Sequence, residues 1–170
     1  MTKIVQVYDS LMSIRHAPYK PHSALAELID NSLQAKSENI SIIAINNDFN
    51  SPKGVVQRLD TIAVLDDGYG MDKETLQSCL AVGFSRNKED KNGIGKFGYG
   101  MTVGSISQAY RVEVYSWQKN GPIIHTYIDL DELRETEAEE IPDIIEVDNL
   151  PILENSRDKI LTKKDSGTLV

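Results

Sequence analysis

A glycine-rich segment past the middle of the chain constrains the fold most. The stretch NGIGKFGYGMTVG carries Gly93, Gly95, Gly98, Gly100 and Gly104, and a helix is expected to begin inside it. Each glycine in a purely structural helix would cost about 1 kcal/mol relative to alanine. A loop whose backbone amides surround phosphate groups, and which leads into the N-terminus of a helix, accounts for these glycines better. The segment therefore predicts a phosphate-binding loop joined to a helix.

Three familiar phosphate-binding templates do not fit this segment. The letters GIGKFG match the dinucleotide pattern G-x-G-x-x-G, but they follow a charged loop rather than a predicted strand. The letters GKF lack the serine or threonine, and the upstream glycine, of a Walker A loop. The companion motifs of a protein-kinase glycine loop do not occur elsewhere in the sequence. The phosphate-binding interpretation therefore needs support from other segments.

The size of the chain suits one domain with a sizeable core. It has 170 residues and a mass of 19.0 kDa, with 40% hydrophobic and 26% charged residues, as in ordinary globular proteins. No apolar run reaches membrane-spanning length, and the first residues lack the pattern of a secretory signal. The single cysteine, Cys79, excludes an internal disulfide and favours a reducing compartment. We therefore expect a single domain over residues 1–170, an intracellular (cytoplasmic or nuclear) location and no membrane partner.

The charge pattern argues against a surface devoted to nucleic acid. The formal net charge is -8, the opposite of the basic footprint of such surfaces. Much of the acid lies in DLDELRETEAEE, residues 129–140, which is typical of a solvated helix or insertion. The scattered histidines and the one thiol form no sequence pattern for a metal site.

Helical and strand patterns together favour an α+β fold. Helices are expected over Tyr8–His16, His22–Lys36, Lys73–Val82 and Tyr99–Ala109. Strands are expected over Ile40–Asn46, Arg58–Asp66, Tyr110–Trp117 and Ile123–Leu130. Helices dominate early and antiparallel strands later, so we expect a two-layer α/β sandwich with helices on one face of a mixed, mainly antiparallel sheet. The end, KDSGTLV, is typical of a strand cut off midway, so we expect an N-terminal fragment of a longer protein.

The predicted helix over ALAELIDNSLQA, residues 24–35, carries a polar stripe. At 3.6 residues per turn, Glu27, Asp30, Asn31 and Gln34 gather on one side, opposite the apolar residues. Taken alone, this is an amphipathic helix with its polar face in water. A second segment, VLDDGYGM, places two carboxylates and two glycines after a predicted strand, which suits either a ligand approaching the main chain or an ordinary Asp-Gly turn.

Taken together, these segments resemble the GHKL ATPase superfamily of gyrase-type topoisomerases, large heat-shock chaperones, histidine kinases and MutL. Its N box matches ELIDNS, its two glycine boxes match DDGYGM and GIGKFGYGM, and a late Gly-Thr box matches SGT. The four motifs occur in the family's order and span Glu27 to Thr168. The letters GFSRNK before the second glycine box look most like the MORC branch, although Thr102 stands where a lysine is expected there. The resemblance implies a Bergerat-type fold.

The resemblance also implies roles for single residues. Glu27 matches the glutamate that activates water against the γ-phosphate, a contribution worth about a hundred- to ten-thousand-fold. Asn31 matches the asparagine whose side-chain oxygen binds Mg²⁺, and the four-residue spacing puts base and metal ligand side by side. Asp66 matches the aspartate that accepts a hydrogen bond from the adenine amine, which selects against guanine. Thr168 matches a residue that assists through ordered water.

The other implied site residues belong to the base pocket or the phosphate loop. Gly68 and Gly70 would shape the pocket, and the loop amides would contact the phosphates. Basic residues of the lid, including Lys96, could neutralise phosphate charge, although a solvated role also suits them. The implied nucleotide-contacting residues are Asn31, Asp66, Gly68, Gly70, Met71, Lys96, Phe97, Gly98, Tyr99, Gly100, Met101 and Thr168.

The resemblance implies an enzyme that hydrolyses ATP to ADP with Mg²⁺, with weak turnover expected from this chain alone. Family members use ATP to close a lid and dimerise, so a homodimer is expected with ATP bound. For a MORC-like parent the implied role is clamping DNA, through the parent protein rather than through this acidic chain. Two alternatives remain open: the catalytic domain of a histidine kinase, and a nucleotide-sensing module that closes without hydrolysis.

Overall fold

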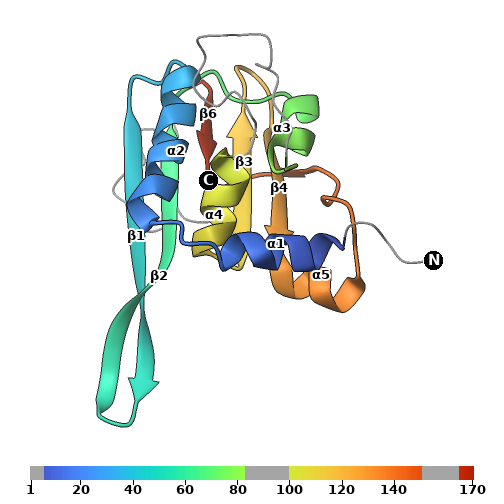
Figure 1. Ribbon diagram of the computed structural model, residues 1–170. Helices are drawn as coiled ribbons and strands as arrows, with labels where there is room; N and C mark the ends of the chain where they lie inside the picture. Colours follow the sequence, from blue (N-terminus) through green and yellow to red (C-terminus); the bar gives the residue numbers. More distant parts are fainter. Residues whose placement is uncertain (1–5, 83–99, 151–164) are drawn as a thin grey trace, which may run out of the picture.

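Six strands form one sheet in the computed structural model, which describes residues 6–82, 100–150 and 165–170 (Figure 1). From one edge to the other their order is β1-β2-β6-β3-β4-β5. Every pairing between described strands is antiparallel, so the parallel pairs that a mixed sheet would allow are absent from this part of the chain. The strands are β1 Ile40–Ser51, β2 Gly54–Asp66, β3 Arg111–Trp117, β4 Ile123–Asp129, β5 Ile145–Val147 and β6 Gly167–Leu169.

Helices cover one face of this sheet (Figure 1), which confirms the predicted α+β sandwich. Within the described residues they are α1 Val7–Arg15, α2 Pro21–Gln34, α3 Lys73–Cys79, α4 Gly100–Gln108 and α5 Leu130–Thr136. Pro21 is the first residue of α2. Its lack of an N–H is harmless there, because the first N–H groups of a helix have no partner within the helix. Asp72 caps α3 as predicted, because its carboxylate accepts a 2.7 Å hydrogen bond from the Thr75 amide. The helices described here are too short or too polar to cross a membrane.

The acidic segment after β4 forms a solvated helix, as its charge pattern predicted. Helix α5 begins directly after Asp129, whose side chain accepts hydrogen bonds from the backbone amides of Asp131 and Glu132. Leu130 is buried, whereas most of the residues that follow it are exposed. One apolar anchor and a carboxylate cap thus hold this short helix against the sheet.

Alternation in β3 and β4 sends apolar side chains toward the helices. Val112, Val114, Ile124 and Ile128 point to that face because residues two apart share a side of a strand. There they pack with one set of helical leucines and isoleucines: Leu11, Leu76, Leu80, Ile106 and Leu130. Burying each such side chain contributes about 1.5–3 kcal/mol, so this cluster fixes the helices on the sheet.

The β1–β2 hairpin is longer than the sequence predicted. We expected strands to end at Asn46 and to restart at Arg58, but the two strands continue to Ser51 and from Gly54. Gly54 follows the turn with a φ of +120°, a conformation that favours glycine. The outer half projects from the body as a two-stranded ribbon (Figure 1), so no buried face imposes an apolar alternation there. Its polar residues therefore resemble a loop in the sequence.

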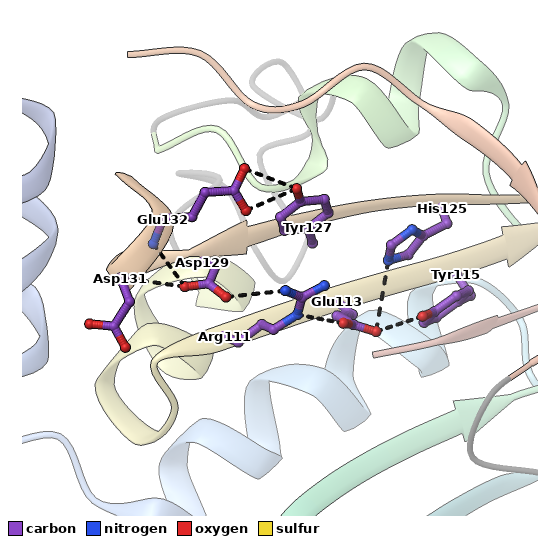
Figure 2. A network of polar contacts seen from close by, with 8 residues as sticks. All are labelled: Arg111, Glu113, Tyr115, His125, Tyr127, Asp129, Asp131 and Glu132. Carbon is purple, nitrogen blue, oxygen red and sulfur yellow. Dashed lines mark hydrogen bonds and ion pairs between the residues drawn. The ribbon is translucent and has the colours of Figure 1, made fainter. Parts of the chain in front are cut away.

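The face of β3 and β4 that points away from the helices carries a polar network (Figure 2). The Glu113 carboxylate accepts hydrogen bonds from Arg111 Nε at 2.6 Å and from the Tyr115 hydroxyl at 2.5 Å. Arg111 also donates to Asp129 at 3.1 Å. The His125 ring stacks on Tyr115 with centroids 4.2 Å apart, and its Nε2 lies 3.8 Å from Glu113 Oε2.

Burial alone would raise the pKa of Asp129, but hydrogen bonds from the amides of Glu132 and Asp131 and from Arg111 lower it. The network lowers two further pKa values. Burial alone would raise the pKa of Glu113, but hydrogen bonds from Tyr115 and Arg111 outweigh burial and lower it. Burial lowers the pKa of His125, and the charge of Glu113 opposes this shift only in part. Both groups therefore take up protons more readily in the unfolded chain than in the folded chain.

We expect the melting temperature to fall in two pH windows. Unfolded histidine titrates near about 6.5, so stability should fall as the pH drops below that value, until the lower folded pKa of His125 is reached. The contribution of Glu113 is present above its unfolded pKa of about 4.3 and is lost as the pH falls through its lower folded value. Melting curves recorded from pH 8 to pH 3 measure both effects.

Two variants test which residue causes each fall in melting temperature. His125→Phe keeps a ring against Tyr115 and should remove the first fall. Glu113→Gln should reduce the second fall, to which Asp129 also contributes because its pKa is lowered too. His16→Phe, at an exposed position, is the matched control and should leave the whole profile unchanged. A His125→Phe profile identical to that of the wild type would show that His125 does not cause the first fall.

Candidate functional site

A cavity of about 330 Å³ lies beside α2, next to the end of β2 and the start of α4. Its walls also include residues of the segment between β2 and α3 and of β6. Of the residues predicted from sequence, Glu27, Asn31, Asp66, Gly70, Met71, Gly100, Met101 and Thr168 line it. Residues from four separate motifs thus surround one space of the size that binds small molecules.

Helix α2 contributes a row of polar side chains to this cavity. Glu27, Asn31 and Gln34 follow one another at intervals of four and three residues, which places them on one side of the helix. The Gln34 Nε2 atom is buried and has no hydrogen-bond partner among the residues that the structure describes. A buried donor without a hydrogen-bond partner costs about 1–3 kcal/mol. This donor in the cavity wall therefore favours a ligand or water that accepts a hydrogen bond from it.

Asp66 is a buried acid of the cavity wall, and two hydrogen bonds fix its carboxylate. It is only 5% exposed. One carboxylate oxygen accepts a 2.8 Å hydrogen bond from the Ser32 hydroxyl, and the other accepts a 2.9 Å bond from the Gly68 amide. These two donors come from α2 and from the loop after β2, so they fix the orientation of the carboxylate. Sequence analysis missed Ser32, which lies next to Asn31 in the N box.

Thr168 is held by a buried serine of the neighbouring strand. The Ser116 hydroxyl of β3 is 3.0 Å from the Thr168 hydroxyl and accepts a 2.8 Å hydrogen bond from the Met71 amide. Ser116 is completely buried. A single hydroxyl therefore connects the first glycine box to the Gly-Thr box. The alternating pattern of a strand predicts on which face of the sheet Ser116 lies. It does not predict which residues the Ser116 hydroxyl contacts.

Two glycines of the cavity wall make close contacts, and the contact of Gly70 with a backbone carbonyl requires glycine. Gly70 has a φ of +68°, and a Cβ there would overlap the carbonyl oxygen of Trp117. A Cβ on Gly100 would overlap the Glu27 carboxylate, which lies against the start of α4. Gly68 does not line the cavity, because it packs against Ala35, whose Cβ would be 2.7 Å from an added methyl group. The structure therefore gives Gly68 a packing role and an amide donor to Asp66.

The predicted base, Glu27, has a partner that the sequence did not indicate. Tyr19, in the loop before α2, lies close enough to Glu27 to be affected by its charge. Burial raises the pKa of Tyr19, and the neighbouring Glu27 carboxylate raises it further. A tyrosine that stays protonated can donate a hydrogen bond to this carboxylate.

Not every residue singled out in the sequence can be placed in the cavity wall. Lys96, Phe97, Gly98 and Tyr99 lie outside the described residues, so the phosphate loop stays a prediction. Thr102, at the position where we expected a lysine, is 1% exposed and does not line the cavity. Cys79 is part of the wall, and burial raises the pKa of its thiol to about 12.

Removing the Ser32 hydroxyl should destabilise the fold. In Ser32→Ala, Asp66 Oδ2 loses its donor at a residue that is only 5% exposed, so we expect the free energy of unfolding to fall by about 1–3 kcal/mol. Chemical denaturation measures this change. Ser13→Ala, which removes an exposed serine that bonds a carbonyl of its own helix, is the control and should stay within about 0.5 kcal/mol. Equal stabilities of the two variants would contradict the role of Ser32.

Comparison with known proteins extends over most of the chain. The family model described as "Histidine kinase-, DNA gyrase B-, and HSP90-like ATPase" matches residues 19–168. Protein MICRORCHIDIA 5 of Arabidopsis thaliana is 31% identical over 93 residues, which are 55% of this chain and 13% of that protein. DNA mismatch repair protein MutL of Buchnera aphidicola is 30% identical over 108 residues, 61% of this chain and 17% of that protein. The chain therefore spans less than a fifth of these relatives' lengths.

Proposed function

Because the chain belongs to the family of histidine kinase-, DNA gyrase B- and HSP90-like ATPases, we propose that it binds ATP with Mg²⁺ in this cavity and hydrolyses it to ADP. The observation that carries the proposal is that Glu27, Asn31, Asp66 and Thr168 line one space although they are far apart in sequence. The membership itself confirms the resemblance found from the motifs. The reaction and its residues are the proposed part.

Two amide side chains of the cavity wall support the proposal that a nucleotide and its metal ion bind here. The Gln34 Nε2 atom, which has no partner within the described part of the chain, offers a donor to a ligand oxygen or ring nitrogen. The Asn31 side-chain oxygen would hold Mg²⁺, which prefers oxygen ligands and usually keeps phosphate oxygens and waters in its shell. When bound, the ion would offset phosphate charge and orient the triphosphate.

Glu27 would act as the general base. In hydrolysis, water attacks the γ-phosphorus, the bond to the β–γ bridging oxygen breaks, ADP leaves, and the carboxylate accepts the proton of the water. The contact between Glu27 and Gly100 places this carboxylate at the beginning of α4, where the backbone amides favour phosphate. Tyr19 would hold the carboxylate in this position without accepting the proton itself.

Asp66 would select adenine. A carboxylate with fixed orientation can accept a hydrogen bond from an exocyclic amine, and guanine presents an oxygen at that position. With guanine, the Asp66 carboxylate and the exocyclic oxygen would be two acceptors with no hydrogen between them. Such a pair costs much free energy in a buried site. The donors Ser32 and Gly68 keep the orientation that this selection needs.

We extend the proposal to lid closure, dimerisation with ATP and a DNA clamp in a longer parent protein. The support for this step is the relationship to a protein named for DNA mismatch repair and to a MICRORCHIDIA protein. The basic residues expected in the lid lie outside the described part of the chain. Full-length activity and partners therefore rest on family membership alone.

Removing the proposed base should separate binding from turnover. We expect Glu27→Ala to keep its affinity for Mg-ATP within about threefold, because it leaves Asn31 and Asp66 in place, and to lose at least about a hundredfold in phosphate release. Calorimetry and a phosphate assay measure the two quantities. Glu38→Ala, at an exposed acid outside the cavity, is the control. Unchanged turnover in Glu27→Ala would remove Glu27 as the base.

The preference for ATP over GTP tests the proposed role of Asp66. We expect ATP to bind at least roughly a hundredfold more tightly than GTP, and Asp66→Asn to lose most of this preference because an amide can also donate to the guanine oxygen. Asp67→Asn changes the neighbouring carboxylate, which bonds to the backbone and side chain of Asn39 outside the cavity, and should keep the preference. Equal affinities of the wild type for ATP and GTP would contradict the role of Asp66.

The same assays separate the alternatives. Release of inorganic phosphate supports an ATPase. Transfer of phosphate to a protein histidine without release would favour a histidine-kinase domain. Tight ATP binding with neither product would favour a nucleotide-sensing module.

A further inference from the structure

The Gln34 side chain carries a buried donor that the fold itself does not satisfy. Its Nε2 atom has no acceptor among the residues that the structure describes, although the side chain lines the cavity. Most buried side-chain donors in native proteins have a partner, so an exception at a cavity wall points to a ligand. A half-turn of the carboxamide exchanges its oxygen and its nitrogen, so the donor can turn toward the cavity without any movement of α2.

The first half of α2 faces the end of the cavity that suits phosphate. The Glu27 carboxylate lies against Gly100, at the beginning of α4, where backbone amides favour an anion. Gln34 lies two turns further along the same side of α2, which is roughly 10 Å at 1.5 Å per residue. The Gln34 donor is therefore far from the position that suits the terminal phosphate.

The second half of α2 contacts the loop that follows β2. Ala35, the neighbour of Gln34, accepts a 3.0 Å hydrogen bond from the Tyr69 amide. Ser32 donates to Asp66, the acid for which we propose adenine selection. Tyr69 also lines the cavity, so an aromatic residue lies at this end as well. Gln34 thus belongs to the end of the cavity where the nucleoside is proposed to lie.

On the basis of the proposed nucleotide site, we propose that Gln34 donates a hydrogen bond to an acceptor of the nucleoside, either a purine ring nitrogen or a ribose oxygen. Asp66 accepts a hydrogen bond and Gln34 donates one, so the two residues recognise groups of opposite kind on one ligand. The empty cavity leaves the Gln34 donor without a partner, and the nucleoside supplies one. Gln34 therefore lowers the stability of the empty chain and raises its affinity for adenosine.

Removing the carboxamide should weaken binding of the nucleoside. Gln34→Met keeps the length of the side chain and removes the donor, so we expect the Kd values for adenosine and for Mg-ATP each to rise about tenfold. Calorimetry measures both. Gln57→Met removes an exposed carboxamide of β2 outside the cavity and should bind both ligands as the wild type does. A loss for Mg-ATP with unchanged affinity for adenosine would place the donor on a phosphate and overturn the proposal.

The stability of the empty chain gives a second readout. Without nucleotide, the melting temperature of Gln34→Met should be higher than that of the wild type, because an apolar group of similar size replaces a buried donor that has no partner. Gln57→Met should melt as the wild type does. A purely structural role of the carboxamide predicts a lower melting temperature for Gln34→Met, and that result would overturn the proposal.

Adenosine analogues identify the acceptor. Replacing one ring nitrogen by carbon, or removing one ribose hydroxyl, deletes a single acceptor of the ligand. One such analogue should bind the wild type about tenfold more weakly than adenosine does, and Gln34→Met should show no further loss with it. A ring analogue with this behaviour assigns the base, and a deoxy analogue assigns the ribose. If every analogue affects both proteins equally, Gln34 contacts neither part of the nucleoside and the proposal is wrong.

These measurements also separate this proposal from the proposed function. A wild-type chain that binds neither adenosine nor Mg-ATP would contradict nucleotide binding in the cavity, and the role of Gln34 with it. A wild-type chain that binds both, with affinities equal to those of Gln34→Met, would contradict only the role of Gln34.

Discussion

The fixed carboxylate of Asp66 is the contact on which the site depends. Asp66 ends β2 and pairs with Thr168 of β6, so it belongs to the sheet. Its side chain accepts hydrogen bonds from Ser32 of α2 and from the Gly68 amide of the following loop. One residue thus connects the strand, the helix and the loop that surround the cavity. Any ligand group that it binds meets an acceptor whose position is already set, and such preorganisation favours selection.

Close backbone contacts hold the rest of the cavity in place. Gly70 lies against the carbonyl of Trp117, and Gly167 leaves no room for a side chain between Asp66 and the Trp117 ring. Gly104 brings α4 close to Ala24 of α2, where an added methyl would be 3.4 Å from the Ala24 Cα. Because these glycines allow main chains to approach, α2, α4 and β6 meet around a small space. The glycine boxes therefore shape the cavity even where they do not touch it.

The sequence predicted the elements and the site better than the contacts between them. Helices and strands followed from periodicity and capping residues such as Asp72, and the order of the motifs predicted that Glu27, Asn31 and Asp66 meet. The ends of β1 and β2 were wrong, because a ribbon without a buried face has no alternation to detect. Ser32 and Ser116 were not singled out, since each acts through a partner far away in sequence, and hydroxyl residues are common on helices and strands.

Charge places a strong condition on the proposed reaction. ATP is a polyanion, yet the described walls of the cavity carry the acids Glu27, Asp66 and Asp72 and neither lysine nor arginine. The beginning of α4 offers backbone amides and the positive end of a helix dipole, which is worth only about 0.3–1 kcal/mol for an exposed charge. That is too little to hold a triphosphate beside three carboxylates. In the proposed reaction, Mg²⁺ and basic residues outside the described walls would have to supply the remaining positive charge, so affinity for the phosphates should depend on the metal far more than affinity for adenosine does.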